Sequence, residues 1–136
     1  MKSLFRVPKR VHNAVILMAD LAVNCRSDVF VSLTEVAERQ GLSRSFLEEI
    51  IAPLKSAGLV RAKRGAYGGY ILSREPEKIT VREIIEAVEG PVTFVECLAA
   101  GQSCPVSGSC TSRRLWGRVQ VKVAEALDVM TLAELI

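Results

Sequence analysis

Histidine is almost absent from this sequence: His12 is the single one among 136 residues. Because histidine is the side chain most often used for proton transfer near neutral pH, one copy argues against acid–base catalysis. No Ser/His/Asp set, phosphate-binding loop or dinucleotide-binding fingerprint occurs in the sequence either. We therefore predict that the protein is not an enzyme.

Long apolar runs are also missing, since no stretch approaches the roughly 18 residues that a membrane span needs. The best candidate, residues 14–19, is stopped by Asp20. Four cations do precede an apolar segment near the start, but polar residues interrupt it and no small-x-small cleavage site follows. We expect a cytoplasmic protein with no membrane partner, whose four cysteines stay reduced unless they hold a metal or sense redox state.

Charge of one sign is not in large excess, because the net charge is only +3, but its distribution is uneven. Residues 1–10 carry four cations and no acid, and residues 61–74 contain Arg61, Lys63, Arg64 and Arg74 and no acid. Basic stretches of this kind in an otherwise balanced domain favour an anionic polymer as partner.

The first predicted helix runs from about Pro8 to Asn24 and is apolar around most of its circumference. Its polar residues form one stripe, which contains Lys9, Asn13, Asp20 and Asn24. A helix of this kind must be covered on more than one side. In so small a domain, we expect a partner subunit to provide part of that cover.

Two further helices predict a helix-turn-helix. Ser32 and Glu35 form a capping box, Gly41 ends that helix, and Ser43 caps the next, which reaches about Ala57. Pro53 should kink this third helix or end its regular part. Strand-like segments at 59–62 and 70–72 then flank a basic, glycine-rich tip, which is the order of a winged helix.

The remainder of the chain divides into a helix, a loop and a long helix. Another capping box at Thr80 and Glu83 begins a helix that ends at Gly90, and a long final helix spans about Thr111 to Val129, with one more turn after Thr131. The predicted fold is mainly α with a small β-hairpin. The predicted units are a winged helix-turn-helix domain at 1–90, a cysteine-bearing loop at 91–112, and a dimerisation helix with a short C-terminal helix at 113–136.

The helix-turn-helix and wing provide the candidate DNA contacts. The first residues of a recognition helix meet base edges in the major groove, and an arginine at a wing tip can enter the minor groove. Glycines 65, 68 and 69 would let the wing backbone approach phosphates closely. The alternatives are a protein-interaction module or a merely solvated basic face. The candidate residues are Ser43, Arg44, Ser45, Glu48, Lys63, Arg64 and Tyr67.

A second constellation is Cys97, Cys104 and Cys110, separated by six and then five residues. Thiolates hold zinc or iron–sulfur clusters, and both need four ligands, so one is missing. His12, Glu89 and Glu96 are the candidates for the fourth position. The spacing is longer than in zinc ribbons, and three ordinary thiols in a loop remain the alternative.

These segments together resemble the IscR-type family of winged-helix transcription regulators, which also holds nitric-oxide-sensing members (the NsrR branch) and repressors of cysteine metabolism. The string from Arg64 to Tyr70 is the most family-specific match. The other matching residues are Leu47, Glu48, Leu54, residues 57–60, Val81 to Val88, the three cysteines, Leu115, Trp116 and Thr131 to Leu135.

The resemblance implies a homodimeric regulator of transcription that binds a two-fold symmetric double-stranded DNA operator. It also implies that Cys97, Cys104 and Cys110 hold an iron–sulfur cluster that switches operator affinity in response to redox state, nitric oxide or iron–sulfur status. The family's histidine three residues after the third cysteine is Arg113 here, and arginine stays protonated.

In the nitric-oxide-sensing branch the fourth ligand can be an acidic residue from the first helix of the partner subunit, and His12 matches that position. Histidine suits iron, and mixed Cys/His ligation raises the potential of a 2Fe–2S centre, the cluster type that we expect in preference to 4Fe–4S. The alternative is a winged-helix regulator with structural zinc or no metal, controlled by a partner protein or small molecule.

Overall fold

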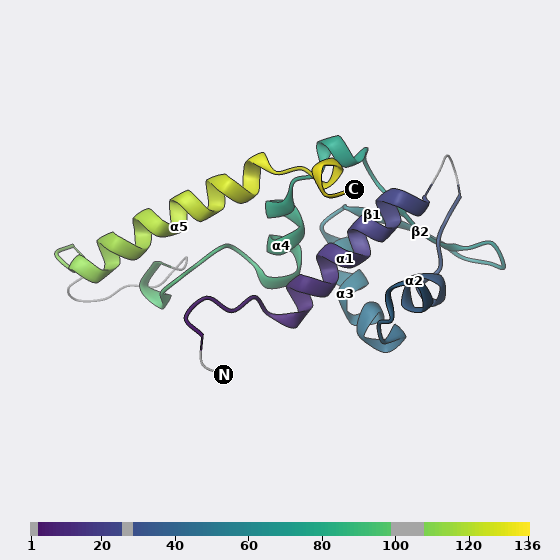
Figure 1. Cartoon of the computed structure of the whole chain (residues 1–136), viewed down its shortest axis with the longest axis horizontal. Coiled ribbons are helices and arrows are strands. Elements are labelled where there is room, and N and C mark those ends of the chain that lie inside the picture. Colours follow the sequence, from purple (N-terminus) through teal and green to yellow (C-terminus); the bar gives the residue numbers. More distant parts are fainter. Residues whose placement is uncertain (1–2, 26–28, 99–107) are drawn as a thin grey trace.

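The computed structural model describes residues 3–25, 29–98 and 108–136. A body of helices and one hairpin carries a long helix that projects from it as an arm (Figure 1). In chain order the elements are α1 (Lys9–Asn24), α2 (Leu33–Gln40), α3 (Arg44–Ser56), β1 (Val60–Lys63), β2 (Gly69–Leu72), the 3-10 turn η1 (Pro76–Lys78), α4 (Val81–Glu89), the 3-10 turn η2 (Glu96–Leu98), α5 (Thr111–Val129) and the 3-10 turn η3 (Leu132–Leu135).

The core of the body is formed by α1, which packs against α3 and α4. Burying these large apolar side chains supplies most of the free energy that holds the body together. The largest side chains that are fully buried are Leu17, Met18, Leu21, Val36, Leu47, Ile50, Leu54, Leu59, Ile79, Ile84 and Leu132.

The helix-turn-helix and wing follow the predicted order. Gly41 has φ 65° at the end of α2, a left-handed conformation that glycine adopts at little cost, and it turns the chain into α3. Strand β1 pairs antiparallel with β2, from Val60 opposite Leu72 to Lys63 opposite Gly69. The predicted fold class, a mainly helical winged helix-turn-helix with a long C-terminal helix, is confirmed.

Pro53 does not end α3, which continues to Ser56. Proline cannot donate to the carbonyl four residues earlier, and that carbonyl belongs to Glu49, an exposed residue. Because water can reach this side of the helix, the lost hydrogen bond costs little. The expectation that this helix reaches about Ala57 is confirmed; of the two effects expected of Pro53, an end to the regular part does not occur, and a kink stays a prediction.

The predicted polar stripe of α1 is not a solvent-facing stripe. Asn13 and Asp20 are buried, with 5% and 3% of their surface exposed. The opposite outcome holds for Val23, which is 57% exposed and lines an apolar groove with Ile16. Part of the apolar circumference of α1 thus lacks cover within one chain, as its sequence pattern predicts.

The arm is attached at both ends. Near its beginning, Trp116 stacks on Phe94 with ring centroids 6.2 Å apart, and Phe5 meets both rings edge-on. Between its ends α5 contacts α4, yet no side chain of α5 is buried. No helix of the described residues is long and apolar enough to cross a membrane.

After α5 the chain returns to the body. The Leu132 N–H donates to the carbonyl oxygen of Ile79 over 2.8 Å, and the Val81 N–H donates to that of Met130 over 2.9 Å. Leu132 is fully buried in the same core as α1. The division of the chain at residues 90 and 112 stays a prediction.

Candidate nucleic-acid interface and cysteine loop

The four predicted base-reading residues lie together at the exposed beginning of α3. Ser43 is the N-cap and its Oγ accepts from the Phe46 N–H at 3.4 Å, while the hydroxyls of Ser43 and Ser45 are 3.0 Å apart. One turn apart, Arg44 Nε and Glu48 Oε1 form an exposed ion pair at 3.3 Å. The helix therefore presents hydroxyl, cationic and anionic groups from one end, as major-groove readout requires.

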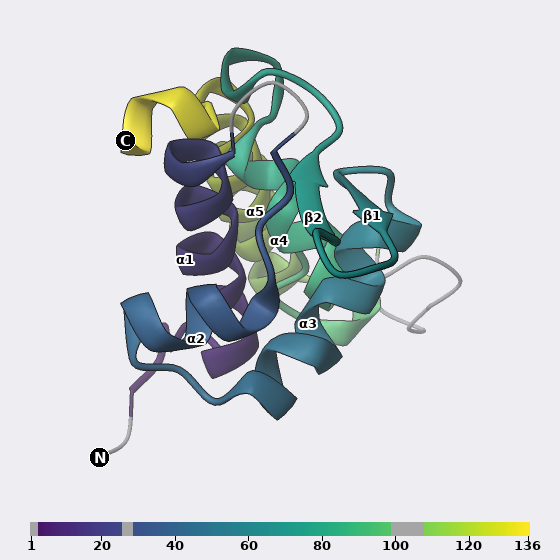
Figure 2. The ribbon, with the colours of Figure 1, turned by 90° about the vertical axis from the view of Figure 1, so that its right-hand side faces the viewer.

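Lys63, Arg64 and Tyr67 are all exposed at the tip of the hairpin, and Tyr67 is 90% exposed. Figure 2 looks onto α2, α3 and this hairpin, which share one side of the body. The Lys63 ammonium lies 5.5 Å from the centre of the Phe30 ring, a cation–π contact that orients it.

The glycines of the wing have an internal role that their sequence did not reveal. A Cβ at Gly69 would collide with the carbonyl of Val31, because Val31 and Tyr70 exchange two backbone hydrogen bonds at 2.7 and 2.9 Å. A Cβ at Gly68 would collide with the carbonyl of Lys63. Gly68 thus allows the wing to turn back on itself, and Gly69 allows β2 to lie close to the segment before α2.

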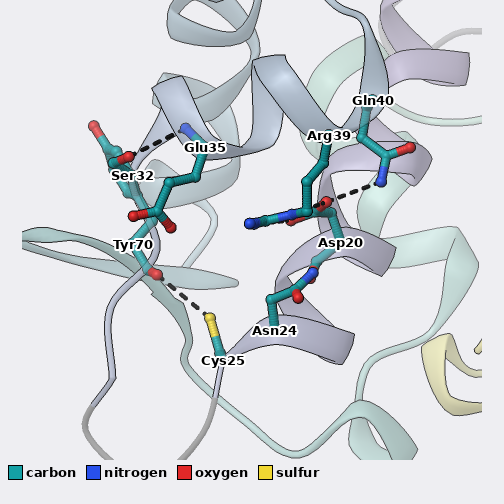
Figure 3. Close-up of polar contacts among 8 residues, drawn as sticks. All are labelled: Asp20, Asn24, Cys25, Ser32, Glu35, Arg39, Gln40 and Tyr70. Atoms are coloured by element: carbon teal, nitrogen blue, oxygen red, sulfur yellow. Dashed lines mark hydrogen bonds and ion pairs between the residues drawn. The ribbon is translucent and has the colours of Figure 1, made fainter.

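Sequence reasoning missed the polar contacts that fix the helix-turn-helix to α1. Arg39 donates two hydrogen bonds to the Asp20 carboxylate, at 2.8 and 3.1 Å, and Gln40 donates a third at 2.9 Å (Figure 3). Arg39 and Gln40 are the last two residues of α2, directly before the turn. An aspartate inside an otherwise apolar helix was the available signal, because a buried carboxylate needs partners.

Electrostatics keep the Asp20 carboxyl ionised. Burial raises its pKa, but the hydrogen bonds from Arg39 and Gln40 and the charge of Arg39 outweigh burial, so that the pKa lies below its ordinary value. The same contact raises the pKa of Arg39. The ion pair therefore holds the end of α2, and with it the beginning of α3, against α1.

Cys25 lies apart from the other cysteines, at the end of α1. Its thiol donates to the backbone carbonyl of Tyr70 at 3.4 Å (Figure 3). Burial raises the pKa of this thiol. Cys25 thus links α1 to the wing as a neutral, half-buried side chain.

Two of the three loop cysteines are described. Cys97 lies in η2, which contacts α5, and Cys110 is the residue directly before α5. Both are half-buried free thiols, and Cys104 lies outside the described residues. These two thiols precede and follow residues 99–107 in the sequence, and cysteine sulfur is the ligand type that iron–sulfur clusters use.

No described histidine or acidic side chain, Glu89 and Glu96 included, forms a group of three with Cys97 and Cys110. Among the described residues no three potential metal-ligating side chains come together. His12 is exposed near the beginning of α1. In Figure 1, α1 begins near the middle of the molecule, whereas α5 begins at its left-hand end. Arg113 lies in the first turn of α5, and its Nε is buried without a hydrogen-bond partner in the described part of the chain.

Comparison with known proteins identifies the family of this chain. A profile described as "Rrf2: Iron-dependent Transcriptional regulator" matches residues 7–136. The chain belongs to the Rrf2 family. It is 42% identical over 104 residues to the HTH-type transcriptional regulator CymR of Bacillus subtilis, covering 76% of this chain and 70% of that protein.

Two IscR proteins are similar over nearly the whole chain. The HTH-type transcriptional regulator IscR of Cronobacter sakazakii is 35% identical over 131 residues, or 96% of this chain and 80% of that protein. The solved structure of T. potens IscR superposes with a TM-score of 0.77 at 40% identity, covering 96% of this chain and 85% of that one. This Rrf2 protein is thus a DNA-binding transcription regulator, and the prediction that it is no enzyme is confirmed.

Proposed function

We propose that this Rrf2 regulator is a homodimer whose operator affinity is switched by an iron–sulfur cluster on Cys97, Cys104 and Cys110. The observation that carries the proposal is the placement of Cys97 and Cys110, two free thiols, at the beginning of an arm whose apolar residues one chain leaves uncovered. The candidate DNA contacts lie on α3 and the wing, whereas Cys97 and Cys110 lie beside the arm, so DNA binding and metal binding can be tested by separate substitutions.

The DNA contacts are assigned to Ser43, Arg44, Ser45 and Glu48 of α3 and to Lys63, Arg64 and Tyr67 of the wing. Arg64→Ala should weaken binding to a duplex selected by the wild-type protein from a random library, because a cation in a narrow minor groove is lost. Lys78→Ala, which removes an exposed cation from η1, is the matched control. Equal affinities of both variants and the wild type in fluorescence anisotropy would remove the wing from the interface.

The homodimer is supported by one apolar stripe of α5. Leu115 and Val129 are 52% and 74% exposed, and their separation of 14 residues places them on one face of the helix. Leu115→Glu with Val129→Glu should therefore yield monomers in sedimentation equilibrium. Val121→Glu, at an equally exposed position on another side of α5, should leave association unchanged.

The three loop cysteines would hold the cluster, which supplies a redox- and nitric-oxide-sensitive link when bound. The chain's own contribution is position: Cys97 and Cys110 precede and begin α5, so a ligand joining them ties the loop to the dimerisation helix. A change in that tie alters operator affinity only insofar as it favours one arrangement of the two DNA-binding domains.

The decisive measurement is the iron, sulfide and zinc content of anaerobically purified protein. We expect iron and sulfide in equal amounts, two of each per chain for the favoured 2Fe–2S centre. Cys97→Ser, Cys104→Ser and Cys110→Ser should each lose them, whereas the matched variant Cys25→Ser should keep them. Zinc instead of iron would favour a structural metal, and no metal would favour control by a partner protein or small molecule.

His12 of the partner subunit is the proposed fourth ligand, and a mixed dimer tests it. One chain carries His12→Ala and the other Cys110→Ala. If His12 acts across the dimer, one site retains all four ligands and the mixed dimer binds half the wild-type iron with the wild-type spectrum. If His12 is no ligand, His12→Ala homodimers keep the wild-type spectrum and cluster lifetime.

A further inference from the structure

The basic stretch at residues 1–10 is not accounted for by α3 and the wing. Its cations divide into two kinds among the described residues. Arg10 is paired with Glu89 at 3.6 Å, whereas Lys9 is exposed and makes no ion pair with a described residue. Lys9 lines a groove of about 330 Å³ at the beginning of α3, whose other walls come from Asn13, the turn at Gly41 and Leu42, Ser43, Ser45, Phe46 and Glu49.

Asn13 is the unusual member of this groove. It is only 5% exposed, and its side chain makes no hydrogen bond to a described residue. Among the described residues, the one side-chain polar atom that is both inaccessible and unpaired is Nε of Arg113. The Asn13 amide, in contrast, lines the groove. An amide that is nearly buried and makes no hydrogen bond to a described residue therefore lines the groove, one helical turn from Lys9. A group of this kind is suited to accept a hydrogen bond from, or donate one to, a bound molecule or water.

The beginning of α3 adds further donors to the same place. The first N–H groups of a helix lack intrahelical partners, and the 13-residue α3 presents those of Arg44 and Ser45 beside the hydroxyls of Ser43 and Ser45. The beginning of α1 lies beside the turn between α2 and α3 (Figure 2), because Lys9 and Asn13 line the same groove as Gly41. An ammonium, an amide, hydroxyls and free N–H groups together suit a phosphate.

We infer that this groove binds a backbone phosphate of the operator, adjacent to the bases that α3 reads, through Lys9 and Asn13. The inference rests on the proposed role of α3, because DNA seated at Ser43 and Ser45 brings its backbone to the groove they line. Glu49 is the acidic side chain among the lining residues, and its charge opposes the phosphate. Removing the charge of Lys9 should therefore weaken DNA binding, whereas removing the charge of Glu49 should strengthen it.

The test measures binding of the full-length protein to a duplex of about 30 base pairs, long enough for two half-sites, selected by the wild-type protein. Lys9→Gln should weaken binding on selected and unrelated duplexes alike and lower the salt slope by about 0.9, the value for one phosphate. The ratio of the wild-type binding constant to that of this variant should fall about threefold between about 50 and about 200 mM salt. Glu49→Gln should tighten binding, and the isosteric Asn13→Asp should weaken it.

Lys78→Gln is the control, because it removes an exposed cation from η1. Lys9 and Glu49 are exposed, so their variants carry the test even if Asn13→Asp unfolds. Wild-type affinity and salt slope in both Lys9→Gln and Glu49→Gln, together with weakened binding by Arg64→Ala, would overturn the phosphate site but not the proposed interface. A wild-type protein that selects no duplex would overturn both.

Discussion

The body and the arm of this protein differ in how many of their side chains are buried. In α1, α2, α3 and α4 every helix buries side chains, and Leu17, Leu54 and Ile84 are fully enclosed. In the 19 residues of α5 no side chain is buried. Because helices in water depend on packing for most of their stability, the body can hold its own shape, whereas the arm would gain the cover it lacks from a second copy in the proposed homodimer.

Capping separates three helices of the body from the arm, although α1, whose N-cap is Pro8, also lacks a side-chain cap. Ser32, Ser43 and Thr80 each accept a hydrogen bond from the first turn of their helix, and Thr80 and Glu83 complete a capping box. At the corresponding position of α5, Cys110 makes no side-chain cap. The N-cap position of α5 thus holds a thiol in place of a capping hydroxyl, and a thiol is the ligand type that the proposed cluster needs.

The largest contrast between the regions is expected from truncation of apolar side chains. Leu54→Ala should lower the free energy of unfolding by about 2–5 kcal/mol, because Leu54 is fully buried and a cavity would remain. Val121→Ala, in the arm, should change it by less than about 0.5 kcal/mol, since Val121 is 53% exposed. Urea denaturation measures both, and equal losses would erase the distinction between the two regions.

Ion pairs should separate the regions by a smaller amount. Asp20→Asn should cost about 1–3 kcal/mol, because the buried carboxylate accepts three hydrogen bonds from Arg39 and Gln40. Arg39 is 37% exposed and can turn to water, which keeps the loss below that of a sealed pair. The matched change in the arm is Glu125→Gln, which breaks an exposed contact of 3.8 Å with Lys122 and should cost almost nothing.

Acid should reveal the same ion pair without a large structural change. The pKa of Asp20 is lowered in the folded protein, and so is that of Glu83, chiefly through its hydrogen bond from Arg74. A carboxyl group whose pKa is lowered by folding stabilises the folded state fully at pH values above its pKa in the unfolded chain, which is about 4. This stabilisation is lost as the pH falls through the pKa of the group in the folded protein. Stability measured by urea denaturation should therefore fall below about pH 4, and less steeply in Asp20→Asn. Identical slopes would show that Asp20 gains nothing from Arg39.

Local signals in the sequence predicted most of this fold. Ser43, Gly41 and the Thr80–Glu83 box act within one turn of the chain, so their patterns specify helix ends directly. The apolar pattern of α5 was equally local. The effect of Pro53 on α3 could not be predicted from the sequence. The free-energy cost of the missing hydrogen bond depends on whether water reaches the carbonyl of Glu49, and only the packed structure decides that.

The contacts that position the site were harder to foresee because they join distant segments. Asp20 is 19 residues from Arg39, and nothing in the spacing pairs them. Gly69 could be identified as a wing glycine, yet the carbonyl of Val31 that requires it lies outside the hairpin. The cysteines stand out from composition alone, but a ligand from another copy of the chain leaves no spacing signal in one sequence.

The smallest difference between body and arm is expected at the helix beginnings. Thr80→Ala should lower the free energy of unfolding by about 1 kcal/mol, because the Glu83 N–H loses its acceptor, which lies at 3.1 Å. Cys110→Ala should change the stability of the metal-free protein by much less, since Cys110 has no cap to lose. Thermal unfolding of both variants after chelation makes the comparison. A loss at Cys110 as large as that at Thr80 would mean that the thiol stabilises α5 by itself, and the beginning of the arm would then be a structural cap instead of a position reserved for a metal ligand.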